Sequence, residues 1–112
     1  MKLPGADKAI VSREKIVDYL LNAAHPDNGG KAEVFAQLGF RHDQWEALAA
    51  ALRNLAASGE VTRAAESPHG GKHIIVGRIQ SPSGKTPLVQ SIWIVDKGAD
   101  AVRLVTVYPH KA

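Results

Sequence analysis

Residues 72–96, KHIIVGRIQSPSGKTPLVQSIWIVD, decide the fold of this chain. Two runs rich in β-branched and other apolar residues, at 72–80 and 87–96, flank the turn-forming sequence Ser81-Pro82-Ser83-Gly84-Lys85. The connection is short enough for an antiparallel hairpin. Two more runs, at about 60–66 and 101–108, are joined to this hairpin by the short segments 67–71 and 97–100. We therefore predict a four-stranded antiparallel meander.

The chain before residue 60 has helical periodicity instead. Ser12 is a good N-cap, and apolar residues follow it at helical spacing until HPDNGG at 25–30 ends the segment. A second, short helix over 31–38 is expected to end at Gly39. Asp43 with Glu46 has the form of a capping box, which opens a third helix.

These patterns predict an α+β fold in which about three N-terminal helices pack on one face of a C-terminal four-stranded antiparallel sheet. We expect a single domain over residues 1–112, with the helical part at about 12–58 and the sheet part at about 60–109. The second face of the sheet is expected to stay at least partly open, and we expect function there.

Composition narrows the function classes. The chain has 112 residues, which is enough for one core, and its 45% hydrophobic and 22% charged residues are typical of a folded globular domain. The absence of cysteine excludes disulfides, thiolate metal sites and thiol nucleophiles. Fourteen Lys and Arg against 11 Asp and Glu give a net charge of +3, which permits an anionic partner without requiring one.

The sequence predicts no membrane association. Its apolar runs are shorter than the ~18 residues of a membrane span, and its first residues lack the apolar core of a signal peptide. We therefore expect a cytoplasmic protein, while export as part of a larger polypeptide stays open.

The loop at residues 25–31 is the first candidate site. Gly29 and Gly30 allow backbone N–H groups to converge before a helix, and Lys31 adds a cation, a combination that suits a phosphate. His25 could act there as a general acid or hold the phosphate. A plain connection with a solvated Lys31 is the alternative. The Walker pattern GxxxxGK[ST] is missing, which excludes a P-loop nucleotidase.

The strands supply further candidates by their alternation. Lys72 and Arg78 share one face of the second predicted strand, and Ile75 and Ile79 share the other. On the last strand, alternation places Thr106 and Tyr108 with Val102 and Leu104, and places Arg103 on the opposite face with Val105 and Val107. Trp93 is either core packing or a base-stacking platform.

The polar set as a whole suits a phosphodiester. The five histidines have no HxH or HxxxH spacing, so we predict no metal and no other cofactor. A cation, a hydroxyl donor and a proton-transfer group can together promote attack of an RNA 2′-OH on its own phosphate, or else form a passive anion site. The candidate catalytic residues are His25, Lys31, Lys72, Arg103, Thr106 and Tyr108, and the candidate nucleic-acid-binding residues are Arg78 and Trp93.

Several segments resemble a bacterial family of small proteins known as a domain of unknown function. They are LPGAD at 3–7, DYLL at 18–21, His25-Pro26, Lys31-Ala32, LGF at 38–40 followed by Trp45, WIV at 93–95, and RLVTVYP at 103–109. This resemblance covers nearly the whole chain and implies no activity.

Helices followed by a four-stranded sheet whose last strand ends in VTVYP are also similar to the barnase, EndoU, colicin and RelE-like ribonuclease fold of bacterial toxins. This resemblance implies a metal-independent endoribonuclease toxin, or a toxin–antitoxin protein, acting on RNA. Thr106 and Tyr108 match the terminal-strand motif, whereas the other four catalytic candidates match in residue type and approximate place. The chain lacks the Glu and His pair of barnase and the dense Lys and Arg of RelE-like toxins.

Two alternatives stay open. One is a non-enzymatic module, such as an antitoxin or immunity-like protein, that binds its cognate partner through an edge strand or a sheet face. The other is a relative that has kept the fold and lost the chemistry.

Overall fold

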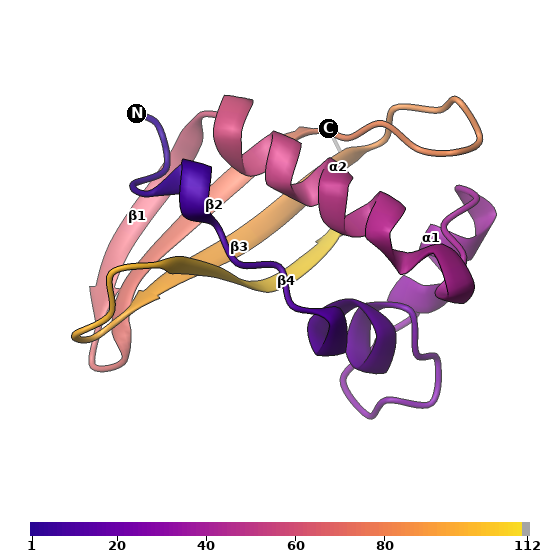
Figure 1. The fold of residues 1–112 in the computed structure, drawn as a ribbon, viewed down its shortest axis with the longest axis horizontal. Coiled ribbons are helices and arrows are strands. Elements are labelled where there is room, and N and C mark those ends of the chain that lie inside the picture. The colour runs from indigo at the N-terminus through magenta and orange to yellow at the C-terminus, as the bar shows by residue number, and fades with distance from the viewer. Residues whose placement is uncertain (111–112) are drawn as a thin grey trace.

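Four strands form one antiparallel sheet in the order β1-β2-β3-β4 (Figure 1). The computed structural model describes residues 1–110. The strands are β1 (Val61–Ser67), β2 (Gly70–Arg78), β3 (Leu88–Asp96) and β4 (Val102–Pro109). Short turns join neighbouring strands in chain order, so the predicted meander is confirmed.

The helical half precedes the sheet and contains one long helix. Its elements are η1 (Ala6–Lys8), η2 (Lys15–Leu20), α1 (Lys31–Gln37), η3 (His42–Gln44) and α2 (Trp45–Ser58). Figure 1 shows α2 lying across one face of the sheet. Leu48, Leu52 and Leu55 recur on one side of this helix and are buried. Gly77 on β2 permits the close approach, since a Cβ there would lie 2.7 Å from Leu55 Cδ1.

The predicted three-helix arrangement holds in part. Ser12 Oγ does accept the N–H of Lys15 at 3.1 Å, as expected of an N-cap. The element that follows is a π-helix of six residues, however, in which the N–H of Leu21 reaches back five residues to the carbonyl of Ile16. It lies beside β4, whereas α2 covers the sheet at β2.

The predicted capping box at Asp43 is wrong. Gln44 precedes α2 and makes no side-chain cap bond. Asp43 instead accepts two hydrogen bonds from Arg41, at 2.9 and 3.1 Å. A guanidinium two residues away offers a bidentate charged partner, and this pairing lowers the pKa of Asp43 through the hydrogen bonds from Arg41.

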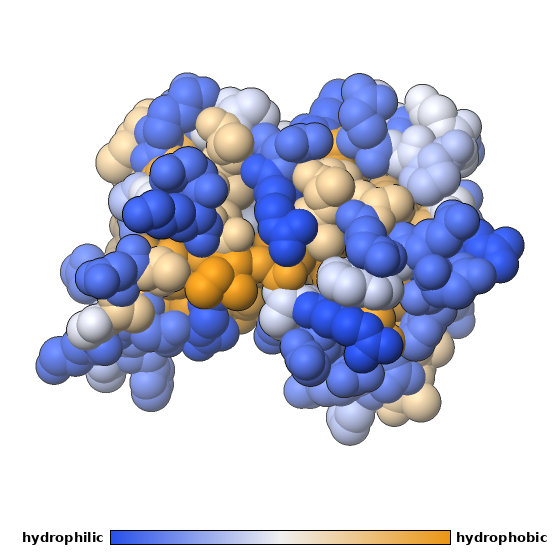
Figure 2. All heavy atoms as spheres, viewed as in Figure 1, coloured by the Kyte–Doolittle hydropathy of each residue, from blue (hydrophilic) through white to orange (hydrophobic). Residues whose placement is uncertain are grey.

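The hydrophobic core lies between the helices and one face of the sheet. Phe35 and Leu52 from the helical half and Ile75, Trp93 and Val107 from the sheet are all essentially inaccessible to solvent. Figure 2 shows that the helix-covered side is hydrophilic over most of its area, with apolar residues visible in a band across its middle. We call the sheet face that contacts the helices the core face and the opposite one the open face.

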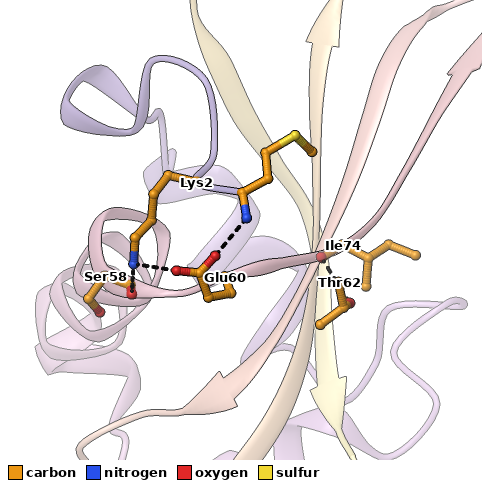
Figure 3. A network of polar contacts seen from close by, with 6 residues as sticks. Lys2, Ser58, Glu60, Thr62 and Ile74 are labelled. Carbon is orange, nitrogen blue, oxygen red and sulfur yellow. Dashed lines mark hydrogen bonds and ion pairs between the residues drawn. The ribbon is translucent and has the colours of Figure 1, made fainter.

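The N-terminal segment connects the two edges of the sheet. Lys2 pairs with Glu60 just before β1, and the N–H of Ile10 donates to the carbonyl of Val102 on β4 at 2.8 Å. Figure 3 shows the first contact: the amino group of Met1 and Lys2 Nζ reach Glu60 at 2.7 and 3.0 Å. These two cations lower the pKa of Glu60 from 4.5 to about 2, mainly through the hydrogen bond from the amino terminus.

Candidate functional site

A β-bulge in β4 decides which side chains reach the open face. Ile92 of β3 lies opposite Thr106, and Trp93 lies opposite Leu104, so Val105 is an extra residue. The bulge resets the alternation of side chains, because two residues of β4 face one position of β3.

The predicted alternation of β4 is therefore wrong. Arg103, Thr106 and Tyr108 lie opposite Ile94, Ile92 and Gln90, and all three occupy the open face. Val102, Leu104 and Val107 are buried on the core face. Simple alternation could not place Arg103 with Thr106, because they are an odd number of residues apart. In β2 the prediction is confirmed: Lys72 and Arg78 are exposed, while Ile75 and Ile79 are buried.

A hydroxyl pair joins the helical half to β4. The Tyr19 hydroxyl from η2 lies 2.8 Å from Thr106 Oγ1. Two ammonium groups flank the Tyr19 ring, with Lys15 Nζ at 5.2 Å and Lys31 Nζ at 5.6 Å from its centroid. The His25 ring contacts the same ring edge-on at a centroid distance of 5.0 Å. Three of the predicted site residues, His25, Lys31 and Thr106, therefore lie next to the Tyr19 side chain.

A cavity of about 410 Å³ opens beside this hydroxyl pair. Its lining residues are Lys15, Tyr19, His25, Asp27, Val105 and Thr106. The lining combines an ammonium group, an imidazole, two hydroxyls and one carboxylate. The Lys31 ammonium group is not part of the lining but lies near the Tyr19 ring. Such a set can hold an anion and exchange protons with it. We call this cavity the Tyr19 site.

The loop that carries His25 is held by Asn28, which is only 2% exposed. Its Nδ2 donates to the carbonyls of Tyr19 and Leu20 at 2.7 and 3.2 Å. Its Oδ1 accepts the N–H of Ala32 at 2.9 Å. Asn28 therefore joins the end of η2 to α1 and fixes the loop over Tyr19.

Two loop contacts restrict what His25 and Lys31 can do. His25 Nδ1 accepts the N–H of Asp27 at 3.0 Å, which leaves Nε2 as the nitrogen available to a ligand. Lys31 Nζ donates to the carbonyls of Asn28 and Asp27 at 3.1 and 3.4 Å. An ammonium group has three donors, so Lys31 keeps one for a further acceptor.

The remaining predicted site residues lie away from this cavity. Lys72 and Arg78 lie on β2. Arg103 donates to both carboxylate oxygens of Asp96, at 2.6 and 3.0 Å, and these hydrogen bonds lower the pKa of Asp96. Tyr108 shares the open face with Thr106, and its hydroxyl accepts a hydrogen bond from Gln90 Nε2.

Trp93 is a core residue, and its role as a base-stacking platform is ruled out by its position. Its side chain is fully buried, and its Nε1 donates to Ser91 Oγ at 2.9 Å. Position 93 lies on the inward side of β3, together with Val89 and Ser91.

Sequence reasoning missed Tyr19, Lys15 and Asn28. Tyr19 fits the apolar stripe of the first predicted helix, which hides the role of its hydroxyl. A half-buried tyrosine usually has a hydrogen-bond partner for that hydroxyl, and this was the available signal. Asn28 stands in a glycine-containing loop, where an asparagine suggests only a turn.

Two kinds of feature are absent from residues 1–110. No helix there is long and apolar enough to cross a membrane. Nor do three or more histidine, cysteine, aspartate or glutamate side chains gather there in a group that could hold a metal ion.

The fold is similar to that of a chain in a solved structure described as a contact-dependent growth inhibition toxin–immunity protein complex from Klebsiella pneumoniae 342. The TM-score is 0.75, the sequence identity is 22%, and the match covers 96% of this chain and 98% of that chain. A comparison with curated proteins gave no match. A family model described as "Domain of unknown function (DUF6883)" matches residues 2–111, and the chain therefore belongs to that family.

Proposed function

We propose that this protein is an endoribonuclease of a toxin–immunity system, which cleaves RNA phosphodiesters at the Tyr19 site without a metal. The observation that carries the proposal is the contact between the Tyr19 and Thr106 hydroxyls, with Lys15, Lys31 and His25 around it. The similarity in fold to a chain of a toxin–immunity complex supports the biological setting. The resemblance to the barnase, EndoU, colicin and RelE-like fold supports the type of reaction.

The proposed reaction is attack of a ribose 2′-OH on the adjacent phosphorus. This attack forms a 2′,3′-cyclic phosphate and breaks the bond to the 5′-oxygen of the next nucleotide. The 2′-OH loses a proton, the 5′-oxygen gains one from the Lys15 ammonium group that lines the cavity, and negative charge builds up on the phosphate oxygens in between. Lys15, Lys31 and the hydroxyl pair supply positive charge and hydrogen bonds for those oxygens.

The carboxylate of Asp27 is our candidate acceptor for the 2′-OH proton, because among residues 1–110 it is the one acidic side chain that lines the cavity. His25 meets the substrate through Nε2. Proton transfer by His25 would require its Nδ1 to release the N–H of Asp27, so we assign His25 first to a hydrogen bond with the phosphate.

The test is incubation of the purified protein with total bacterial RNA in EDTA. We expect discrete fragments from the wild-type protein and a roughly hundredfold slower reaction for Tyr19→Phe and Lys31→Ala, on the scale of losing one transition-state donor. Lys97→Ala removes an exposed lysine from the β3–β4 turn and serves as the matched control. Intact RNA with the wild-type protein, or full activity in both site variants, would refute the proposal.

Substitution of His25 by glutamine separates its two possible roles. Glutamine keeps a hydrogen-bond donor near the place of Nε2 but cannot transfer a proton at neutral pH. A phosphate-binding role predicts that His25→Gln keeps most of the cleavage rate lost in His25→Ala. Equal loss in both variants would assign proton transfer to His25.

A non-enzymatic protein-binding module is the second candidate function. Strand β1 favours it, because residues 62–67 are exposed on both faces at an edge of the sheet. A strand of a partner could add to such an edge. This function predicts a stable complex with the product of a neighbouring gene, detected by size-exclusion chromatography, and no RNA turnover at any protein concentration.

A further inference from the structure

A second hollow lies on the open face between β1 and β2. Its volume is about 210 Å³, and its lining residues are Arg63, Ala65, Lys72 and Ile74. Arg63 lies opposite Ile74, and Ala65 lies opposite Lys72, so the two basic residues are diagonal neighbours on one face. Diagonal positions are about 7–8 Å apart, which two long side chains can span to contact one anion.

The charges around this hollow suit an anion. Both basic side chains are exposed, and neither takes part in an ion pair within residues 1–110. No acidic side chain of the described part of the chain lines the hollow. Glu66 also belongs to β1, but it lines a different cavity, together with Pro4 and His73. The hollow therefore presents two unpaired cations over a floor of alanine and isoleucine.

The strand register connects this hollow to the Tyr19 site. Thr106 lies opposite Ile92, Ile92 opposite Ile74, and Ile74 opposite Arg63. This row crosses all four strands on the open face, a distance of three strand spacings, or about 14 Å. Nucleotides advance at least the ~3.4 Å of a stacked helix, so a single strand spans this distance with about four nucleotides or fewer. Half-buried isoleucines form the floor between the two ends.

We propose that the Arg63–Lys72 hollow binds a backbone phosphate of single-stranded RNA whose scissile phosphate lies at the Tyr19 site. The RNA crosses the open face at right angles to the strands. Unpaired bases can pack on the isoleucine floor, whereas the bases of a duplex are turned inward and cannot. The path of one RNA strand from the hollow to the cavity rests on the proposed function. The anion site in the hollow rests only on the two cations and their strand register.

The test measures binding separately from cleavage. Fluorescence anisotropy is recorded with an eight-nucleotide single-stranded RNA, 2′-O-methylated throughout so that no 2′-OH can attack. The variants are Arg63→Gln/Lys72→Gln and, as a control of equal charge, Lys85→Gln/Lys97→Gln on exposed loops. We expect about tenfold weaker binding for the first pair and a fall of about 0.7 in the slope of log affinity against log salt, since the pair holds one phosphate and each phosphate contact contributes ~0.7. The control pair should bind as the wild type does.

The outcomes distinguish this site from the proposed function. Equal binding by the wild type and the Arg63/Lys72 variant overturns the phosphate site, even if the wild type cleaves natural RNA. Weakened binding in that variant supports the phosphate site, even if no RNA is cleaved and the proposed function falls. Absence of RNA binding by the wild type, with loss of a protein partner in the Arg63/Lys72 variant, would reassign the hollow to an acidic protein surface and overturn the proposal.

Discussion

The two faces of the sheet consist of alternate residues of the same strands, yet they differ in almost every property. On the core face, Ile75 and Trp93 are fully buried beneath the helical half. On the open face, the adjacent Ile74 and Ile92 are half-buried, and Lys72 and Arg78 are exposed. Stability is concentrated on one face, so the other face can carry charge and hydroxyl groups at little cost to the fold.

The bulge in β4 keeps this separation. Without the extra residue at Val105, either Thr106 and Tyr108 or Val102 and Leu104 would exchange faces. The bulge therefore directs the polar side chains of β4 out of the core and toward the site.

Deletion of Val105 should have the largest effect on the difference between the two faces of the sheet. A one-residue slip would either bury Tyr108 and Thr106 or expose the apolar residues that precede the bulge, so we expect a loss of more than about 4 kcal/mol in the free energy of unfolding. Chemical denaturation followed by circular dichroism measures it. Val105→Ala, which keeps the residue count, should cost about 1 kcal/mol or less. A deletion no more harmful than this control would contradict the role of the bulge.

Alanine substitution of two adjacent isoleucines sharpens the comparison between the faces. Ile75→Ala leaves a cavity in the closed core, so we expect a loss of about 3–4 kcal/mol, whereas Ile74→Ala on the open face should lose about 1 kcal/mol. Both substitutions lower strand propensity equally, so the difference between the two losses reports the difference in burial. Urea denaturation gives both values, and similar losses would mean that the open face is covered in solution.

The smallest effect is expected at Glu60, where the N-terminal segment meets the start of β1. Its pKa is lowered to about 2 from 4.5, so its contribution to stability is present above pH 4.5 and disappears as the pH falls toward 2. Glu60→Gln should therefore melt slightly below the wild type at pH 7 and at the same temperature near pH 2. The contact is exposed, so salt should reduce the difference.

Thermal melting at several pH values measures this effect. Glu66→Gln is the matched control, since Glu66 is an exposed residue of β1 that forms no ion pair in the described part of the chain. A pH dependence of equal size in both variants would contradict the assignment to the contacts of Glu60 with Met1 and Lys2.

The sequence predicted the secondary-structure elements better than it predicted the tertiary contacts between side chains. Turn-forming residues and β-branched runs identified all four strands, because those signals are local. The sequence does not decide whether Trp93 lies in the core or on the surface, because either position is compatible with an apolar strand. The sequence did not predict the π-helix or the Arg41–Asp43 pairing. In both, a group chooses among several nearby hydrogen-bond partners, and secondary-structure propensities do not rank those choices.

For the candidate site, the sequence identified the residue types and the tertiary structure decided which of them meet. His25, Lys31 and Thr106 could be selected as chemistry for a phosphate, but Tyr19 and Asn28 acquire their roles only when η2 packs beside β4. Lys72 and Arg103 carry the right charge, but strand register places Lys72 with Arg63 and leaves Arg103 with Asp96. Secondary structure follows from short-range sterics and hydrophobic periodicity, which each segment carries in its own sequence, whereas a site depends on register and on one inserted residue, which only the packed sheet determines.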